Sequence, residues 1–400
     1  MGTKNNGYKQ SLGQELISLL KNNIREYMMY IVLVAIIVFF AIQTDGAFVS
    51  AYSVSVLFNQ SAYVAVLAIG MTIILILKHI DLSVGYVAGF CGAAAAIMLT
   101  NWHWPVYAVI PIIIMLGILI GTYQGLLVTR VGIPAFVVTL AGMFIFRGLL
   151  GLATSGNGTI IVSDDFFRGL NNNFIPDIPI LDGMHFLTLL IGAIAVVFII
   201  ISQIKARRNK QKYNFRVVST PIFVGALVLV SVAIMGVIYI LASYKGIPVS
   251  AVIVAAILLI YNFVLNKTKL GRYIYGIGGN DQAAELSGVN VKNVTLISFI
   301  SMGTLAAIAG ILYTSRLKSA TPSAGVGFEM DAIASSYIGG VAVSGGVGKV
   351  TNTIIGTFII MSLSYGMDLM GIDTFLQYIV KGIIFIMAVA FDIISRKKRG

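Results

Sequence analysis

The stretch VSVLFNQSAYVAVLAIGMTIILIL, residues 54–77, decides the fold class. It contains no Asp, Glu, Lys or Arg. A helix needs about 20 consecutive, mainly apolar residues to cross the hydrocarbon core of a bilayer. The run exceeds that length and lacks the strict alternation of a barrel strand. Residues 54–77 therefore predict a membrane-spanning helix.

The composition shows that this run is typical of the whole chain. Of the 400 residues, 58% are hydrophobic and only 10% are charged, whereas a soluble domain carries about 25% charged residues. So few charges exclude a soluble globular protein and a disordered chain. We expect an all-α, polytopic membrane protein that forms one transmembrane domain over residues 1–400. Similar runs predict about twelve spans, at 28–43, 54–77, 82–100, 106–128, 133–152, 185–204, 217–243, 247–265, 294–315, 330–344, 352–371 and 375–394.

The distribution of charge predicts the orientation. Segments rich in Lys and Arg are 1–27, 205–216, 266–293 and 395–400. They alternate with loops that have few basic residues and contain Asp45, Asp164, Asp165, Asp177, Asp182, Glu329 and Asp373. Basic loops remain on the cytoplasmic side of a membrane, so both termini are expected to be cytoplasmic, as an even number of spans requires. The net charge of +12 is thus scattered over short loops at membrane ends, which argues against nucleic-acid binding. The long segment 153–184 is then an outer loop.

Catalytic and metal-binding patterns are missing from the sequence. The single cysteine, Cys91, excludes a disulfide framework, and His79, His103 and His185 lack the spacing of metal ligands. The glycine-rich stretch at 339–348 is followed by Lys349-Val350 and not by the Lys-Ser/Thr of a phosphate loop. We expect no catalytic residue, no metal and no nucleotide site in this chain.

The inner loop 266–293, NKTKLGRYIYGIGGNDQAAELSGVNVKN, predicts a short helix. Asn280 or Asp281 is suited to cap its start, and Gly288 to end it in a left-handed conformation. Helices shorter than about 12 residues are marginal in water, so this helix has to pack on something. The ends of its own membrane helices and a partner protein at the membrane surface are both consistent with the residues.

Four stretches together resemble the permeases of binding-protein-dependent, sugar-importing ABC transporters of the ribose, galactose and xylose type. They are TKLGRYIYGIGGNDQAAELSGVNV at 268–291, LAIGMTIILILKHIDLSVGYVAGF at 67–90, VTRVGIPAFVVTLAGMFIFRGL at 128–149, and RLKSATPSAGVGFEMDAIASSYIGGVAVSGGVGKVTNTIIGT at 316–357. The chain departs from ribose-type permeases at about 185–243, because three predicted spans instead of one lie between the outer loop and the inner loop, at 185–204, 217–243 and 247–265. This longer form is similar to xylose and multiple-monosaccharide permeases. The resemblance implies the permease fold of ribose and vitamin B12 importers.

The resemblance also implies partners and a role for the short helix. In this family the corresponding helix couples the permease to a cytoplasmic ATPase, which binds ATP and Mg, so the permease itself needs no cofactor. A second permease copy and an extracytoplasmic sugar-binding protein complete such importers, and the expected location is the bacterial cell membrane. The residues that match the coupling helix are Asn280, Asp281, Ala283, Ala284, Glu285, Leu286 and Gly288. Ala284 and Gly288 are small enough for close approach to a groove wall, and Glu285 is suited to pair with a basic residue of the ATPase.

Polar residues in or near the spans are candidates for the translocation pathway. They are Asn59, Gln60, Asp81, Glu329, Asp331, Ser335, Ser336 and Gln377. Asp81 is also suited to cap the next helix at the cytoplasmic boundary, and Asp331 to cap its own helix. Lys381 is expected to snorkel towards the outer side. Arg316 and Lys318, in the fourth matched stretch, are candidates for docking a binding protein.

Two other classes compete with the importer hypothesis. An ion-coupled secondary transporter usually buries carboxylates at mid-membrane, and the predicted spans show no convincing central carboxylate. An intramembrane enzyme needs a nucleophile and a base, or a metal cluster, on facing spans, and no such set is apparent. Within the ABC class, a permease for branched-chain amino acids remains an alternative to a monosaccharide permease.

Overall fold

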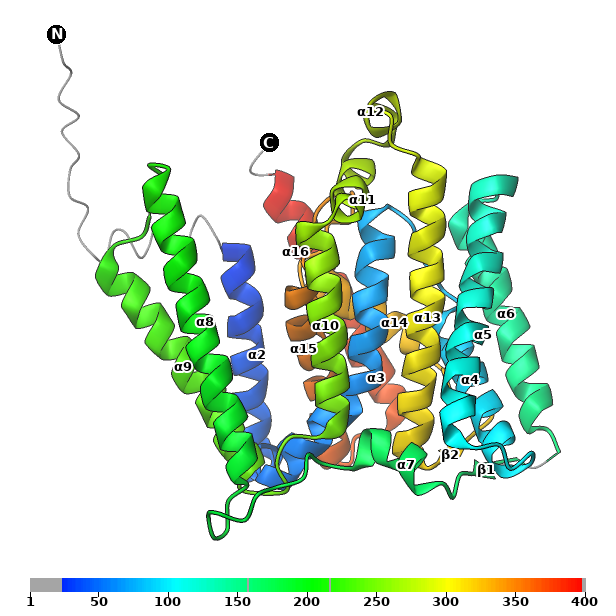
Figure 1. The fold of residues 1–400 in the computed structure, drawn as a ribbon, viewed down its shortest axis with the longest axis horizontal. Coiled ribbons are helices and arrows are strands. Elements are labelled where there is room, and N and C mark those ends of the chain that lie inside the picture. The colour runs from blue at the N-terminus through cyan, green and yellow to red at the C-terminus, as the bar shows by residue number, and fades with distance from the viewer. Residues whose placement is uncertain (1–23, 157, 216, 398–400) are drawn as a thin grey trace. The chain divides into compact units, whose positions relative to one another are not determined.

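A computed structural model describes residues 24–156, 158–215 and 217–397. The chain divides into two compact units, one formed by residues 1–30 and 175–247 and the other by 31–174 and 248–400. We describe each unit by itself. The prediction of one domain over 1–400 stays a prediction, and most of the predicted N-terminal segment 1–27 lies outside the described residues. Helix α2 (Ile24–Gln43) begins in the first unit and ends in the second (Figure 1).

The larger unit is almost entirely helical. Its elements after α2 are η1 (Ala47–Val49), α3 (Ala51–Ile76), α4 (Val84–Thr100), α5 (Val106–Leu126), η2 (Leu127–Val131), α6 (Ala135–Thr154), β1 (Ile160–Ile161), α7 (Asp165–Asn172), α10 (Val249–Lys267), α11 (Lys269–Gly279), α12 (Asp281–Leu286), α13 (Val291–Leu317), β2 (Ser319–Ala320), α14 (Phe328–Ile338), α15 (Val350–Leu369) and α16 (Thr374–Lys397). At one end of this unit lie α12 and the C-terminal end of α16, and at the other end lie α7 and the strands (Figure 1). This arrangement agrees with the all-α prediction.

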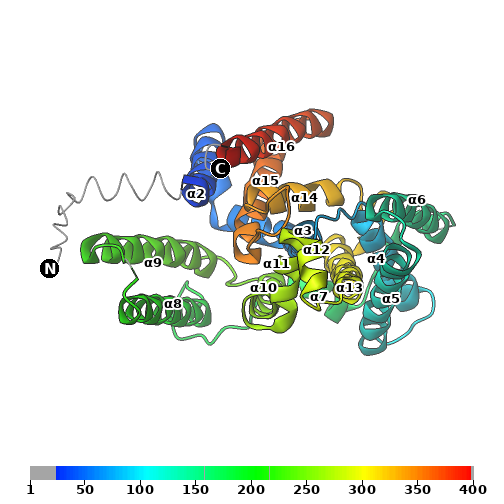
Figure 2. The same ribbon diagram turned by 90° about the horizontal axis from the view of Figure 1, so that it is seen from above.

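Helices α3 and α13 form the centre of the larger unit. Seen from above, α3 lies among α10, α13, α14 and α15 (Figure 2), and α13 also packs along α4 and α5. Glycines permit the close approach, because a Cβ on Gly310 would collide with the carbonyl oxygen of Ala88, and a Cβ on Gly303 with that of Gly117. Small residues on neighbouring turns are the usual means of tight helix packing in membranes. Helix α4 uses the same device, because its Gly92 lies against Gly310 and Thr314.

Two crossings of the larger unit are only partly helical. After α3, the irregular segment 77–83 runs into the interior, and α4 starts beside the segment that precedes α14, since Gly85 is packed against Gly325. Helix α14 has 11 residues and is followed by the irregular segment 339–349, which reaches the end of α3 through the bond from Gly346 N–H to Ile76 O (2.9 Å). Irregular backbone at membrane depth is tolerated where protein buries it. The predicted span at 330–344 is therefore a short helix plus an irregular segment.

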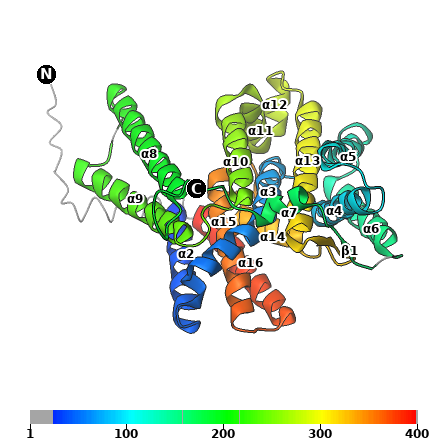
Figure 3. The ribbon, with the colours of Figure 1, turned by 60° about the horizontal axis from the view of Figure 1, so that its bottom comes forward.

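Residues 158–174, part of the loop that the sequence predicts to be outside, pack on the helices of the larger unit. Strand β1 pairs with β2 in antiparallel register, Ile160 with Ala320, and α7 lies beside α10 and α13 (Figure 3). Asp164 caps α7 by accepting from the N–H of Phe167 (2.7 Å). The strands and α7 thus cover this end of the helices of the larger unit.

The smaller unit contains a hairpin of two helices, α8 (Phe186–Lys212) and α9 (Thr220–Ala242). The two helices pack closely where Gly192 meets the side chain of Ile238. His185 caps α8 and is itself held by Ile175 O and the hydroxyl of Thr188. The sequence prediction of two spans in this region agrees with the two long apolar helices.

The lengths and apolar composition of the helices are those expected of a membrane protein. Within the described residues, eight helices are long and apolar enough to cross a membrane, and three shorter apolar helices accompany them at 27–43, 84–100 and 374–387. Helix α14 is too short to be counted this way. The predicted total of twelve thus includes one crossing of mixed structure, and the exact number stays a prediction.

Candidate functional site

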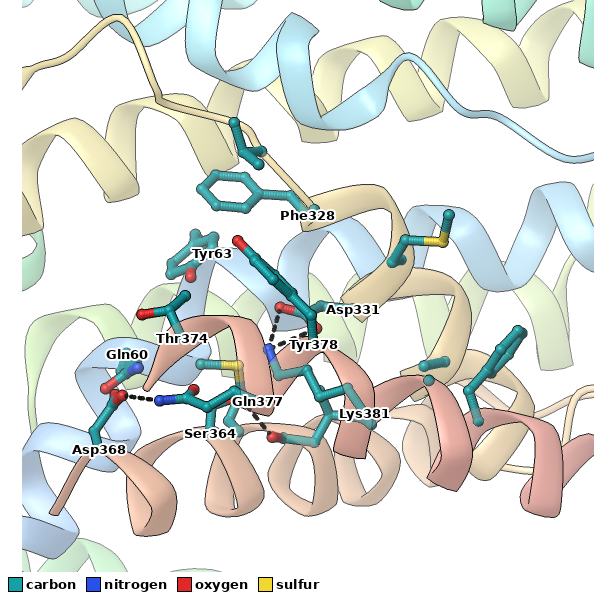
Figure 4. Close-up of a pocket in the computed structure, with 18 residues that line it drawn as sticks. Gln60, Tyr63, Phe328, Asp331, Ser364, Asp368, Thr374, Gln377, Tyr378 and Lys381 are labelled. Carbon is teal, nitrogen blue, oxygen red and sulfur yellow. Dashed lines mark hydrogen bonds and ion pairs between the residues drawn. The ribbon is translucent and has the colours of Figure 1, made fainter. Parts of the chain in front are cut away.

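A cavity of about 450 Å³ with both polar and apolar walls lies in the larger unit, among α3, α14, α15 and α16. Figure 4 shows its side chains converging from these helices. Its lining combines amide, carboxylate, hydroxyl and ammonium groups with aromatic rings, and includes Gln60, Tyr63, Phe328, Asp331, Ser364, Asp368, Thr374, Gln377, Tyr378 and Lys381. Of the predicted pathway residues, the cavity brings together Gln60, Asp331 and Gln377.

An ion pair crosses the cavity from α14 to α16. Nζ of Lys381 lies 3.1 Å from Oδ1 and 3.3 Å from Oδ2 of Asp331, and their side chains are only 20% and 15% exposed. The expectation that Lys381 snorkels is wrong, because its ammonium group finds a carboxylate inside the protein. Two charges buried together cost less than either alone. The pair therefore contributes polar atoms to the cavity lining, and its two opposite charges offset each other.

A second polar contact links α15 and α16. The side-chain amide of Gln377 donates to Oδ1 of Asp368 (2.8 Å) and to the carbonyl oxygen of Ile372 (3.0 Å). Aromatic rings form another wall, with the Tyr63 and Phe328 centroids 4.6 Å apart. Ligand sites typically combine apolar walls with a few placed polar groups. This combination suits a small neutral molecule with several hydroxyl groups.

Three predicted pathway residues are placed in structural contacts instead. Asn59 accepts from the hydroxyl of Ser250 (2.7 Å), and so links α3 to α10. Ser336 donates within its own helix to Ala332 O (2.9 Å) and also bonds Ala68 O on α3 (3.2 Å). Ser335 is fully buried and does not line the cavity. The amide of Asn59 and the hydroxyl of Ser336 thus bond neighbouring side chains or backbone, as polar residues within membrane helices often do. The hydroxyl of Ser335 has no hydrogen-bond partner among the described residues.

Asp81 lies in the irregular segment before α4 and is 2% exposed. Its Oδ1 accepts from the N–H (2.9 Å) and the hydroxyl (2.7 Å) of Ser83, and the Ser83 hydroxyl accepts from the amide of Gln124 on α5 (2.8 Å). Asp81 therefore holds a turn before α4, and its carboxylate lies in the interior of the larger unit. Asp81 does not line the cavity.

Glu329 lies at the first turn of α14 and is 8% exposed. Its Oε2 faces Gly85 in the first turn of α4, where a Cβ would lie 2.6 Å away. This oxygen has no hydrogen-bond partner among the described residues. The N-terminal ends of helices carry partial positive charge, so the two helix starts provide a favourable place for the carboxylate. Glu329 thus supports the junction of two short helices outside the cavity lining.

The predicted short helix of the inner loop is present as α12. Asn280 caps it by accepting from the N–H of Ala283 (2.9 Å), and Gly288 follows with φ +84°, as the sequence predicted. Of the candidate residues only Ala284 is buried, while Leu286 is 90% exposed. Ala284 therefore packs against its own chain. Asp281, Ala283 and Glu285 are exposed together with Leu286.

Helix α11 connects α12 to the membrane helices. Gly278 is packed against Ile76 O at the end of α3 and against Gly346 N, with no room for a Cβ. The hydroxyl of Tyr275 donates to Gly348 O (2.8 Å), and burial raises the pKa of Tyr275, so the hydroxyl remains a donor. The segment 339–349 joins α14 to α15, and both of these helices line the cavity. Sequence reasoning missed this contact, because no local pattern pairs residues so far apart.

The predicted docking residues lie at the end of the larger unit that carries α7 and the strands. Arg316 is half-exposed in the last turn of α13. Lys318 is exposed, has φ +57°, and its carbonyl oxygen accepts from the N–H of Val162 (3.0 Å). Both are available on the face opposite to α12.

The fold and the cavity together define a polytopic membrane permease. Residues 53–389 match the family model described as "branched-chain amino acid transport system / permease component", and the chain belongs to this permease family.

Individual relatives cover nearly the whole chain. The xylose transport system permease protein XylH of Haemophilus influenzae is 38% identical over 376 residues, which cover 94% of this chain and 98% of the relative. XylH of Escherichia coli K12 is 37% identical, covering 94% and 93%. The ribose import permease protein RbsC of Haemophilus influenzae is 31% identical over 371 residues, 92% of each chain. No solved structure matches the chain.

Proposed function

We propose that this chain is the membrane permease of an ATP-driven importer that carries a monosaccharide across a bacterial cell membrane. The relatives named for xylose and ribose transport support the substrate class. The observation that carries the proposal is the cavity, because its ion pair, amide group and aromatic walls suit a neutral polyhydroxy compound. Such a compound is a better fit than an amino acid, whose two charges would compete with the Asp331–Lys381 pair.

The partners follow from the same proposal. A separate ATPase subunit binds and hydrolyses ATP with Mg, an extracytoplasmic binding protein delivers the sugar, and a second copy of this chain completes the permease. The exposed side of α12 around Leu286 and Glu285 docks into the ATPase. Arg316 and Lys318, on the opposite face, meet an acidic rim of the binding protein. Both termini are then cytoplasmic, as the basic loops favour.

The contacts of α11 indicate how movement of α12 reaches the cavity. A shift of α11 displaces Ile76 at the end of α3 and Gly346 and Gly348 in the segment before α15, because Gly278 and Tyr275 touch all three. Helices α3 and α15 both line the cavity. Closely packed contacts transmit displacement instead of absorbing it. We infer that docking of the ATPase changes the shape of the cavity through this contact.

The cavity bears on the alternative of an ion-coupled secondary transporter, because its lining contains carboxylates. The predicted spans show no convincing central carboxylate, yet in the structure Asp331 and Asp368 both line the cavity. Asp331 is paired with Lys381 and Asp368 accepts from Gln377, so both carboxylates have partners. The relatives favour the ATP-driven importer over this alternative.

A mild-detergent pull-down of the tagged chain from its native host tests the proposed assembly. We expect an ATPase in comparable amount, and its loss when Leu286 is replaced by Asp. The matched control is Leu317→Asp, an exposed leucine at the opposite end of the larger unit, which should retain the ATPase. Recovery of the chain alone, under conditions that preserve known importer complexes, would contradict the assembly.

A further inference from the structure

The hairpin of α8 and α9 carries a smaller pocket of its own. It has a volume of about 180 Å³ and lies between the last turns of α8, the connecting segment and the first turn of α9. Gln203, Arg207 and Lys210 form its polar side, and Val218 and Phe223 belong to its apolar side. A pocket with one cationic and one apolar side is suited to an amphiphilic anion.

Arg207 is held in a defined position within this pocket. Its Nη2 donates to the hydroxyl of Thr220 (3.1 Å), and its guanidinium group stacks over the ring of Phe223, 4.5 Å from the centroid. Its Nη1 is buried and has no hydrogen-bond partner among the described residues. A buried donor without an acceptor is costly. An oxyanion in the pocket would satisfy it.

The surrounding charge is one-sided. Residues 205–212 contain five basic side chains, Lys205, Arg207, Arg208, Lys210 and Lys212, and the sequence has no Asp or Glu between Asp182 and Asp281. The first turn of α9 starts at the same end of the hairpin and adds the partial positive charge of a helix N-terminus. No acidic side chain of this segment is therefore available to neutralise the pocket.

The length of α8 places the pocket at the level of lipid headgroups. With 27 residues and a rise of 1.5 Å per residue, α8 is about 40 Å long, which exceeds the hydrocarbon core of about 30 Å. Only 17% of the apolar window of α8 and 6% of that of α9 is buried inside the chain. Lipid is thus a natural neighbour along the hairpin, and its basic end extends beyond the hydrocarbon.

We propose that this pocket binds the headgroup of an anionic glycerophospholipid. The phosphate accepts hydrogen bonds from Arg207 and Lys210, and the glycerol and first acyl carbons lie along Val218 and Phe223. A zwitterionic lipid carries the same phosphate, but its ammonium group is repelled by the neighbouring basic residues. Basic residues at the end of α8 also complement the helix dipole, and that role alone predicts no preference between lipids.

Native mass spectrometry of the full chain, released from nanodiscs with equal phosphatidylglycerol and phosphatidylcholine, tests the proposal. The wild-type protein should retain phosphatidylglycerol selectively. Arg207→Gln should lower that retention at least about tenfold, because a hydrogen bond to a charged group contributes about 1.5–3 kcal/mol. Arg208→Gln removes the same charge from an exposed neighbour that does not line the pocket, and should change retention about twofold or less at physiological ionic strength.

Three results would overturn the proposal. The first is equal retention of both lipids by the wild-type protein, and the second is an equal loss in Arg207→Gln and Arg208→Gln. The third is displacement of the lipid by millimolar inorganic phosphate, which would indicate a site for a free anion.

Phe223→Leu provides an independent variant, which keeps an apolar wall but loses the stacking under Arg207. It should weaken retention about two- to fivefold, in keeping with about 0.5–1 kcal/mol for a cation–π contact.

Discussion

Helices α3 and α9 are both apolar spans, yet they have opposite surroundings. The apolar window of α3 is 89% buried inside the chain, whereas that of α9 is 6% buried, although α9 has the higher mean hydropathy. Helix α3 carries Gln60, Tyr63 and Thr72 within its apolar sequence. Helix α9 has hardly any polar side chain apart from its ends and Ser231.

The difference teaches that hydropathy reports lipid exposure more than burial in a membrane protein. Lipid accepts apolar side chains as readily as a protein core does, so the most apolar helices are free to face it. Polar residues are placed where protein or a cavity receives them. Glycines follow the same division, because those of α13 face backbone atoms, while Gly225 and Gly236 of α9 have open space around them.

The largest expected effect distinguishes these two kinds of glycine. Gly310→Ala in α13 places a Cβ against the carbonyl oxygen of Ala88, and forced overpacking of this kind costs about 1–3 kcal/mol or more. We expect a loss of folded protein, measured by yield and size-exclusion profile in detergent. Gly236→Ala in α9 is the matched control, and should be neutral or stabilise the helix by about 0.5–1 kcal/mol. Equal behaviour of the two variants would remove the contrast between the helices.

The second effect concerns the charges inside the cavity. Lys381→Met leaves Asp331 without its partner, and removing one member of a buried pair costs about 3–5 kcal/mol. Partial exposure of the pair places the expected loss near the lower end, with uptake lost as well. The double variant Asp331→Asn, Lys381→Met should recover most of the thermal stability. A double variant no more stable than Lys381→Met would show that the ion pair is not what the lysine provides.

A smaller effect is expected at the contact between α11 and the segment 339–349. Tyr275→Phe removes the hydrogen bond to Gly348 O, at a cost of about 1 kcal/mol. We expect uptake to fall several-fold while ATP hydrolysis by the assembled importer continues. Tyr273→Phe, on the same helix but exposed, is the control. A proportional fall of both activities in Tyr275→Phe would argue against a coupling role.

The smallest expected effect is on the local stability of the smaller unit, and it concerns Asp177. Although partial desolvation opposes it, the N–H groups of Leu187, Ile178 and Phe186, with His185, hold the pKa of Asp177 below its ordinary value. A carboxylate with a lowered pKa stabilises the folded state above its unfolded pKa of about 3.9, and the contribution is lost as the pH falls below that. Asp177→Ala should speed amide exchange at the start of α8 at pH 6. Below about pH 3, exchange in the two proteins should converge, and a persistent difference there would exclude the carboxylate as the cause.

Much of the fold was predictable because its signals are local. The apolar runs predict the long helices, and Asn280 and Gly288 predict the bounds of α12 from their capping properties alone. The interior was predictable only in part. Gln60, Asp331 and Gln377, three of the predicted pathway residues, line one cavity. The positions of Tyr63, Ser364 and Tyr378 and the pairing of Lys381 depend on which helix faces meet, and no periodicity encodes that. The sequence predicted a turn in the segment 77–83 but not the burial of Asp81, because that burial depends on distant helices.

Uptake of labelled D-xylose and D-ribose by cells with and without this chain tests the central claim most directly. Cells are compared after ATP depletion and after proton and sodium gradients are dissipated with ATP maintained. An ATP-driven permease predicts uptake of at least one monosaccharide that requires the chain, ends on ATP depletion and continues without the gradients. Uptake that survives ATP depletion but ends with the gradients would contradict the account and identify an ion-coupled transporter.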